Sequence, residues 1–226
     1  ADDHRHFVHA DGTPFFWLGD TWWLGLVKRL RWPAEFHELA ADRRAKGFTV
    51  IQLVAGLYPD MPAFDERGLG DGGFPWERLY TRIRPEYFDA ADRRIQYLVE
   101  QGLMPCVLGC WGYHLPWLGT EKMKQHWRYL MARWGTWPVV WCTSGEQTMP
   151  WYLSGNKEAE AQQLRREWTD VTRYLRATDP FHRLITAHPR RNARDELLEP
   201  ALLDFEMQQT GHGNPAEKPA AAARAG

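Results

Sequence analysis

The sequence predicts an α/β fold, a (β/α)8 barrel of the TIM type that is preceded by a short N-terminal β-hairpin. Apolar runs of strand length alternate with stretches that carry apolar residues at helical spacing, which is typical of a parallel sheet covered by helices. No glycine-rich phosphate loop follows the first strand, which disfavours the alternative of an open doubly wound sheet. A length of 226 residues suits one large domain of this kind.

The first elements are predicted to form the hairpin. Strand-like residues 7–9 and 15–18 flank Asp11-Gly12, a strong signal for a hairpin turn. The second of these runs leads into Asp20 and is counted as the first barrel strand. A helix is predicted over 32–46, because a proline stands in its first turn and a glycine follows its end.

The middle of the chain continues the alternation. Strands are predicted at 48–54, 103–109 and 138–142, with helices over 88–98 and 123–134. A long connection rich in glycine and proline follows the first of these strands. Because loops of this size in a compact domain are usually functional or partly disordered, we expect it to overhang the C-terminal ends of the strands. It carries Asp60, Asp65, Asp71 and Trp76.

The last elements are a helix over 164–175, a strand at 183–187, a short helix at 194–198 and a sixth strand at 203–209. The final twelve or so residues resemble the start of a sixth helix. A complete barrel typically needs ~250 residues. We therefore expect one C-terminally incomplete barrel domain over 1–226, with about six β/α units present and about two missing.

Composition narrows the functional classes. The net charge of −1 gives no field that would favour nucleic acid or an anionic membrane, and no apolar run is long enough to span a bilayer. The first residues do not form a signal peptide, which leaves both a cytoplasmic and a secreted bacterial location open. Cys106, Cys110 and Cys142 lie in apolar runs and are expected to be buried free thiols, not a disulfide framework or a zinc site. No cofactor is expected.

Tryptophan is the compositional outlier, with 13 in the chain. A single tryptophan is most often core filler. Clustered at strand ends, however, indole rings suggest a cleft lined by flat apolar faces, which suit the C–H faces of sugars. Eight tryptophans fall at or just past predicted strand ends: Trp17, Trp22, Trp23, Trp76, Trp111, Trp117, Trp141 and Trp151.

The apolar run that begins at Pro138 leads into a small-residue turn and then into Glu146. Chemistry in β/α barrels sits at the C-terminal ends of strands, so Glu146 occupies the position of a catalytic acid. Every other predicted strand also ends in a polar group, and together they predict a carbohydrate site. The expected substrate-binding residues are Asp20, Trp22, Trp23, Gln52, Trp111, His114, Gln147, His188, Gln209 and His212.

Other interpretations of these residues stay open. Asp20 could be a helix cap or a turn residue, and a single strand-end histidine is often structural. Three strand-end histidines and several carboxylates could bind a catalytic metal, but these histidines form no His-x-His or His-x-x-x-His pair. A serine or cysteine triad lacks its nucleophile elbow. The hypotheses are thus a glycosidase, a non-catalytic sugar-binding barrel and a metal-dependent hydrolase.

Four motifs in order resemble the apiosidase-like family of glycoside hydrolases. They are the runs 12–23 and 47–52, the stretch from Trp141 to Glu146, and Gln208-Gln-Thr-Gly-His212. The resemblance implies a (β/α)8 barrel, usually followed by a small β-sandwich, that cleaves a glycosidic bond. The expected substrate is a plant or microbial polysaccharide side chain. The resemblance also implies that Glu146 is the acid/base, although family members usually have Gly-Gly-Asp at this point. The family's second catalytic carboxylate would lie beyond Gly226, and the plausible stand-ins within the chain are Asp20 and Glu206.

Overall fold

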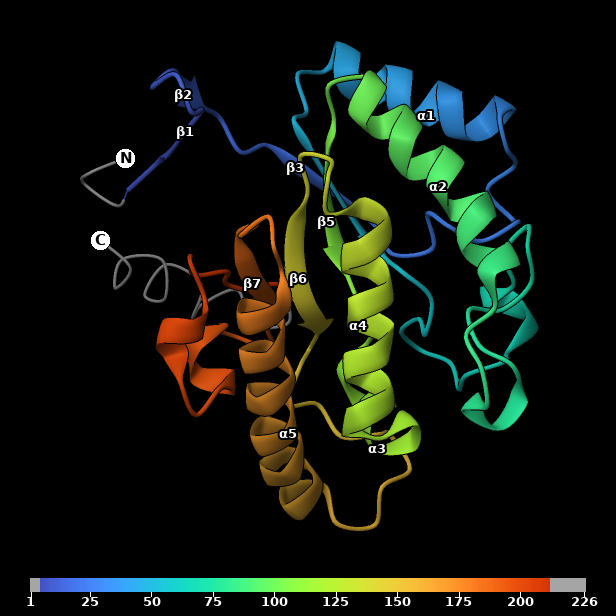
Figure 1. Ribbon diagram of the computed structural model, residues 1–226, viewed down its shortest axis with the longest axis vertical. Helices are drawn as coiled ribbons and strands as arrows, with labels where there is room; N and C mark the ends of the chain where they lie inside the picture. The colour runs from blue at the N-terminus through green and yellow to red at the C-terminus, as the bar shows by residue number, and fades with distance from the viewer. Residues whose placement is uncertain (1–4, 212–226) are drawn as a thin grey trace.

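The computed structural model describes residues 5–211. Its centre is a parallel sheet of five strands in the order β3-β4-β5-β6-β7, so that each strand pairs with its neighbour in sequence. Figure 1 shows this sheet behind a layer of helices. The strands are β3 Gly19–Trp22, β4 Val50–Val54, β5 Met104–Leu108, β6 Val140–Gly145 and β7 Ile185–His188.

The helices connect successive strands and pack on one face of the sheet. The long helices α2, α4 and α5 each carry a buried apolar stripe, and the same cluster includes sheet residues such as Leu53 and Trp141. Such strand–helix alternation is the expected origin of a parallel sheet. The helices are α1 Ala34–Ala45, α2 Pro85–Glu100, α3 Leu115–Leu118, α4 Thr120–Trp134 and α5 Lys157–Thr178. Short 3-10 turns are η1 Glu66–Gly68, η2 Arg78–Tyr80, η3 Gly112–His114, η4 Arg194–Glu196 and η5 Pro200–Leu202.

The opposite face of the sheet, which we call the inner face, carries its own apolar cluster. Alternation along β4 sends Val50 and Val54 to this face, while Ile51 and Leu53 face the helices. Cys106 and Cys142 pack in the inner cluster, and all three cysteines are free and buried, as expected from the sequence. The inner face is therefore the interior side of the barrel wall.

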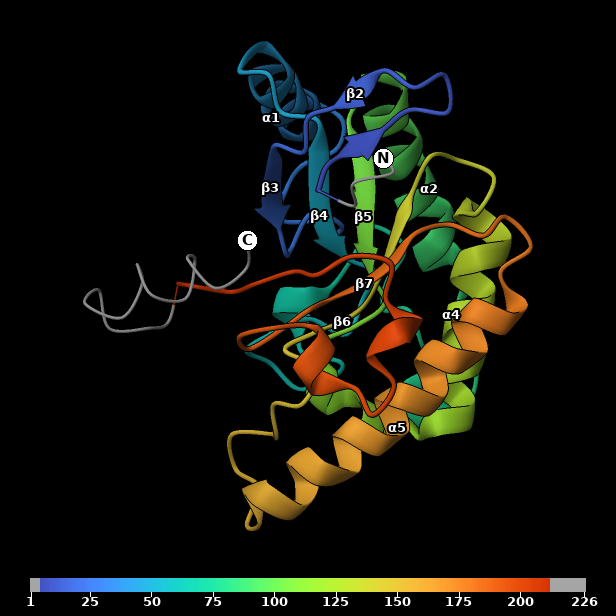
Figure 2. The same cartoon turned by 90° about the vertical axis from the view of Figure 1, so that its left-hand side faces the viewer.

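The N-terminal hairpin is confirmed, with β1 Phe7–Val8 antiparallel to β2 Pro14–Phe15. Figure 2 shows it lying across the N-terminal end of the sheet. Its aromatic rings cover the inner face: the Phe7 and Trp17 ring centres lie 5.0 and 5.2 Å from that of Phe205. An apolar cavity of about 280 Å³ lies between the hairpin and the starts of the strands.

The predicted strand at 15–18 is corrected by the structure, because β2 and β3 are separate elements. Thr49 interrupts the run: its hydroxyl donates to the Phe16 carbonyl at 2.6 Å and accepts from the Leu18 N–H at 3.0 Å. The first parallel strand therefore begins at Gly19, so that Asp20 lies inside the strand instead of at its end.

The segment 203–209 was predicted to be a sixth strand, and this was wrong. It leaves the edge of β7 after one backbone contact, from the Asp204 N–H to the Ile185 carbonyl at 2.9 Å. It then pairs antiparallel with the loop after β7, through Ala193 N–H to Met207 O at 3.0 Å. Backbone groups of Met207 and Gln209 thus bond to the loop after β7, and these groups are not available for a parallel ladder with β7 itself. The helix predicted after Pro215 lies outside the described residues.

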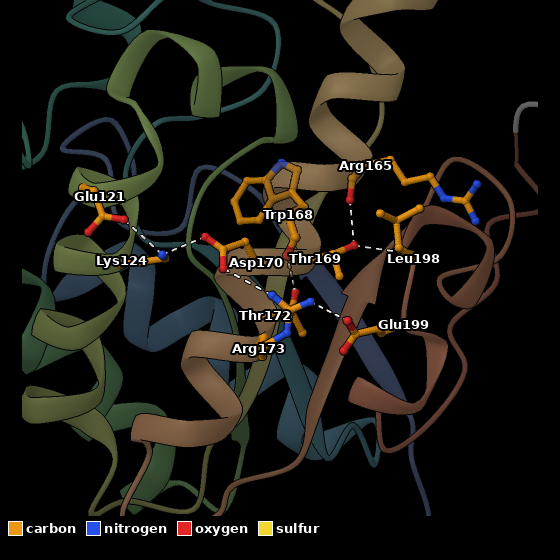
Figure 3. Close-up of polar contacts among 10 residues, drawn as sticks. All are labelled: Glu121, Lys124, Arg165, Trp168, Thr169, Asp170, Thr172, Arg173, Leu198 and Glu199. Carbon is orange, nitrogen blue, oxygen red and sulfur yellow. Dashed lines mark hydrogen bonds and ion pairs between the residues drawn. The ribbon is translucent and has the colours of Figure 1, made fainter.

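Charged side chains join α4, α5 and the η5 turn on the outer surface, as Figure 3 shows. The Lys124 ammonium lies 3.0 Å from Glu121 and 2.7 Å from Asp170. Arg173 continues this chain from Asp170 to Glu199. Such exposed pairs contribute little stability individually. Within residues 5–211, no helix is both long and apolar enough to cross a membrane.

Candidate active site

Glu146 follows β6 directly and lies at the C-terminal edge of the sheet. Its backbone is left-handed, with φ of 43°, and its N–H donates to the His188 carbonyl at 2.6 Å, at the end of β7. The Gln209 amide donates to the Glu146 carboxylate Oε1 at 2.7 Å. The side chain is only partly buried. The end of β6 therefore presents an oriented carboxylate at the position where barrel chemistry occurs.

Two glycines bring the loops after β5 and β6 into direct contact. A Cβ at Gly145 would overlap the ring of Trp111, and a Cβ at Gly112 would lie 2.6 Å from the Glu146 carbonyl oxygen. Trp111 and Gly145 also form an isolated parallel bridge. The position of Glu146 thus depends on close backbone packing that larger residues would prevent.

An aromatic cluster stands beside Glu146 at the ends of three strands. The ring centre of Trp23 lies 5.4 Å from Trp111 and 5.0 Å from His188, and Trp111 lies 5.8 Å from His188. Trp23 and His188 are partly exposed, whereas Trp111 is 5% exposed. The structure therefore brings together four of the predicted residues with Gln209: a carboxylate, two indoles and an imidazole.

A second wall of this mouth was not predicted as a site. Tyr152 is 45% exposed, and its hydroxyl donates to Asp60 Oδ1 at 2.5 Å. Burial of the phenol, the hydrogen bond to Asp60 and the charges of Asp60 and Glu146 together raise the pKa of Tyr152. The Tyr152 ring also contacts Trp151 and Tyr113, at 5.2 and 6.0 Å between centres. The long connection after β4 thus reaches the rim, as expected, through Asp60.

The structure does not bring Asp20 and Trp22 into this mouth. Both face the helix layer, because they occupy alternate positions of β3. Asp20 accepts a hydrogen bond from the Trp22 indole at 2.9 Å and forms a short ion pair with Arg43. Burial opposes ionisation of Asp20, but the Arg43 and Trp22 hydrogen bonds outweigh it and lower the pKa. Trp22 packs on Phe36 of α1, 5.5 Å between ring centres.

Two other predicted ligands, Gln147 and His114, are interior residues. The Gln147 side chain is fully buried and accepts hydrogen bonds from Thr143 and Ser144. His114 is also fully buried, with Nε2 bonded to the Tyr58 carbonyl at 2.9 Å, and burial lowers its pKa to about 4. These are structural roles, so both assignments are corrected.

Gln52 lies deeper than predicted, on the inner face of the sheet. Its amide nitrogen is 3.5 Å from the Met207 sulfur and 3.8 Å from Cys142 Sγ. The Gln52 side chain is therefore buried on the inner face and does not lie at the C-terminal ends of the strands. His212, the last predicted ligand, lies outside the described residues.

Sequence reasoning missed Glu196, in the short η4 turn. Its carboxylate is 5% exposed and accepts hydrogen bonds from the backbone N–H groups of Arg190 at 2.8 Å and Thr148 at 3.3 Å. Burial raises its pKa to about 7 despite these donors. Nothing in the local sequence distinguishes it from a surface glutamate, since its burial comes from distant loops. Within residues 5–211, no three His, Cys, Asp or Glu side chains are arranged to hold a metal ion.

Solved structures with this fold define its class. A glycoside hydrolase family 5 protein from Bacteroides vulgatus ATCC 8482 is 22% identical with a TM-score of 0.67, and the match covers 94% of this chain and 44% of that one. A structure described as a glycoside hydrolase is 23% identical with a TM-score of 0.66, covering 95% and 48%. The endo-1,4-beta-mannanase from Rhizomucor miehei is 14% identical with a TM-score of 0.55, covering 80% and 58%. The chain therefore has the TIM-barrel fold of these structures and spans about half the length of the first two.

Within this class, the chain belongs to the Apiosidase-like family. It matches the catalytic domain of that family over residues 1–225. The resemblance inferred from the four sequence motifs is thereby confirmed. No curated protein matches the chain.

Proposed function

We propose that this protein hydrolyses O-glycosidic bonds and that Glu146 is the acid that protonates the leaving oxygen. The observation that carries the proposal is the Glu146 carboxylate at the end of β6, held by Gln209 and flanked by Trp23 and His188. Glycoside cleavage needs a proton donor next to the leaving oxygen, and a carboxyl group oriented by a neighbouring amide meets this need. The family membership supports the same reaction class.

The neighbouring side chains suit a sugar in this mouth. The partly exposed Trp23 offers an apolar ring for the C–H face of a sugar, and the His188 imidazole lies beside it at 5.0 Å. Asp60 and Tyr152 offer hydrogen-bonding groups for hydroxyls on the other wall. We propose a polysaccharide side chain as the substrate.

Hydrolysis of this kind also uses a second carboxylate, about 5–10 Å from the first. Neither stand-in suits the role, because Asp20 faces α1 and Glu206 binds Arg194 at 3.4 Å. We propose that the second carboxylate is supplied by β/α units outside residues 1–226. The chain spans about half the length of the two glycoside hydrolase structures with 22% and 23% identity, which leaves room for such units.

The placement of Asp20 and Glu206 away from the mouth also favours one alternative, a carbohydrate-binding barrel without catalysis. Plant pectin separates the two possibilities. We expect the wild-type protein to release sugar from pectin and the Glu146→Gln variant to release it about 10²–10⁴-fold more slowly, while still binding the polysaccharide. Chromatography of the released sugar and calorimetry of binding are the measurements.

The control is Glu199→Gln, which removes an exposed carboxylate that pairs with Arg173 on the far side of α5. It should behave as the wild type does. Undiminished release by Glu146→Gln would show that another residue is the acid. Binding of pectin by the wild type without any release would support the non-catalytic barrel.

A further inference from the structure

Glu196 connects the loop that carries Glu146, after β6, with the loop that follows His188, after β7. One carboxylate oxygen accepts the Arg190 N–H at 2.8 Å, and the other accepts the Thr148 N–H at 3.3 Å. Thr148 is two residues past Glu146, and Arg190 is two residues past His188. A single buried side chain therefore bridges the loop after β6 and the loop after β7.

Two more contacts make the same connection. The Glu146 N–H donates to the His188 carbonyl at 2.6 Å, and the Gln147 amide lies 3.5 Å from the Glu196 carbonyl. Glu146 itself has a left-handed backbone, a conformation that persists only where its surroundings hold it. The Glu196 carboxylate is placed to hold it.

We propose that Glu196 is a positioning residue for Glu146: by fastening the loop after β6 to the loop after β7, its carboxylate sets the direction of the catalytic side chain. The role rests on the proposed function, since it concerns the placement of the acid. Glu196 does not touch the sugar in this proposal. It acts through the backbone of both loops.

The surroundings of Glu196 determine when this brace is complete. The positive charge of Arg190 favours the ionised form of Glu196. The other charged groups around the η4 turn have their own partners: Arg165 from α5 binds the Leu197 carbonyl at 3.0 Å, Asp195 accepts from Asn192, and Arg194 pairs with Glu206.

Since burial dominates and raises its pKa to about 7, Glu196 changes its protonation state close to neutral pH. The ionised carboxylate accepts from both N–H groups, whereas the protonated form turns one oxygen into a donor. Because the raised pKa means that protonation favours the buried state, the brace is most stable below pH 7 and loses stability as the pH rises through about 7.

The variant Glu196→Gln tests the brace, with Glu199→Gln as the matched control in the next turn. Glutamine keeps the size of the side chain but offers one acceptor instead of two. At pH 8, we expect the backbone amides of Thr148 and Arg190 to exchange at least about tenfold faster in Glu196→Gln, because each amide loses a charge-assisted hydrogen bond. Exchange measured by NMR should be unchanged in Glu199→Gln.

Turnover on pectin then separates positioning from a purely structural role. In Glu196→Gln we expect kcat to fall by up to about a hundredfold, with KM unchanged and the dependence of kcat on pH near neutrality removed. Wild-type amide exchange, or faster exchange with wild-type kcat and pH profile, would overturn the proposal.

If the Glu146→Gln variant itself retains full turnover, the proposed function fails while the exchange result still stands. Amide exchange in the wild type between pH 6 and 8 provides a check that needs no variant. Because a raised pKa favours the closed loops at lower pH, the Thr148 and Arg190 amides should both become less protected as the pH rises through about 7, after correction for the intrinsic exchange rate. Protection of both amides that rises over this range would count against the brace.

Discussion

At the scale of single residues, the end of β6 combines three different requirements. Gly145 must lack a side chain because the Trp111 ring lies on it, and Glu146 must adopt a left-handed backbone. Gln147 turns into the interior to bond Thr143 and Ser144. Gly145 therefore leaves space for the Trp111 ring, Glu146 presents its carboxylate, and Gln147 is buried in the interior. Of these three residues, only Glu146 is exposed enough to contact a ligand.

The Gly145→Ala variant tests the first requirement. The added methyl group would overlap the Trp111 ring and push the loop after β5 away, so we expect a loss of about 1–3 kcal/mol in the free energy of unfolding and a large loss of turnover. Chemical denaturation and the pectin assay measure the two effects. Gly155→Ala is the control, since a Cβ there meets nothing within 4 Å. Equal stability of the two variants would contradict the close packing.

The Tyr152→Phe variant tests the wall opposite Trp23. It removes the hydroxyl that donates to Asp60 and keeps the ring. Because the pair is partly exposed, we expect less than about 1 kcal/mol of lost stability and a severalfold rise in KM on pectin. Tyr152→Ala should raise KM further, because it also removes the ring. An unchanged KM in both variants would exclude this wall from the site.

At the scale of elements, the edge of β7 differs from the rest of the sheet, because no further strand pairs with it among the described residues. The Asp204 carboxylate binds both β7 and α5. It accepts a hydrogen bond from the Ile185 N–H at 2.6 Å and pairs with Arg176 of α5 at 2.7 Å. The Thr186 hydroxyl adds a bond to the Phe205 carbonyl at 3.2 Å. Side chains thus hold the segment after η5 against β7 where a backbone ladder is missing, and this segment delivers Gln209 to Glu146.

The Asp204→Ala variant should loosen this segment. We expect a loss of about 1–3 kcal/mol, because the Ile185 N–H loses its acceptor, together with a longer distance between Gln209 and Glu146. Thermal unfolding and amide exchange at Ile185 measure the effect. Asp195→Ala, which removes only an exposed contact to Asn192, is the control. Retained protection of the Ile185 amide would show that the segment holds itself in place.

At the scale of the whole molecule, buried titratable groups govern the response to pH. His126 is fully buried between Trp76, whose indole donates to Nδ1 at 3.3 Å, and the Gly109 carbonyl, 3.0 Å from Nε2. Burial lowers the pKa of His126 and of His114 to about 4. Both histidines are therefore neutral in the folded protein at pH values where the unfolded chain binds protons.

We expect stability to fall as the pH decreases from about 6.5 to 4, because the unfolded state gains protons on these histidines over that range. Each shift corresponds to an upper limit of about 3 kcal/mol. Glu196 acts with the opposite sign: its raised pKa means that the folded state gains a proton between about pH 7 and 4.5, which adds stability as the pH falls.

Denaturant unfolding at pH 7, 5.5 and 4.5 measures the free energy of unfolding and so the balance between the histidine and Glu196 contributions. The acid loss should be steeper in Glu196→Gln and shallower in His126→Gln than in the wild type. The exposed His182 provides a control as His182→Asn, which should keep the wild-type slope. Identical slopes in all three variants would contradict the assignment.

Most of the architecture could be predicted from the sequence, because apolar periodicity reports which face of an element is buried. The runs at 48–54, 103–109 and 183–187 became parallel strands, and the turn at Asp11-Gly12 became a hairpin. The errors arose where local patterns allowed two outcomes. The first parallel strand begins at Gly19, after Leu18, and Asp20 and Trp22 lie inside it, where they face the helices.

The sequence by itself determined the succession of strands and helices, the family and the position of Glu146 at a strand end. It did so because each of these depends on neighbouring residues. Only the tertiary structure decided that Trp23, Trp111 and His188 cluster beside Glu146, that His114 and Gln147 are interior residues, and that Glu196 is buried between the loops after β6 and β7. These facts depend on contacts between loops that are far apart in the chain, and no local pattern encodes them.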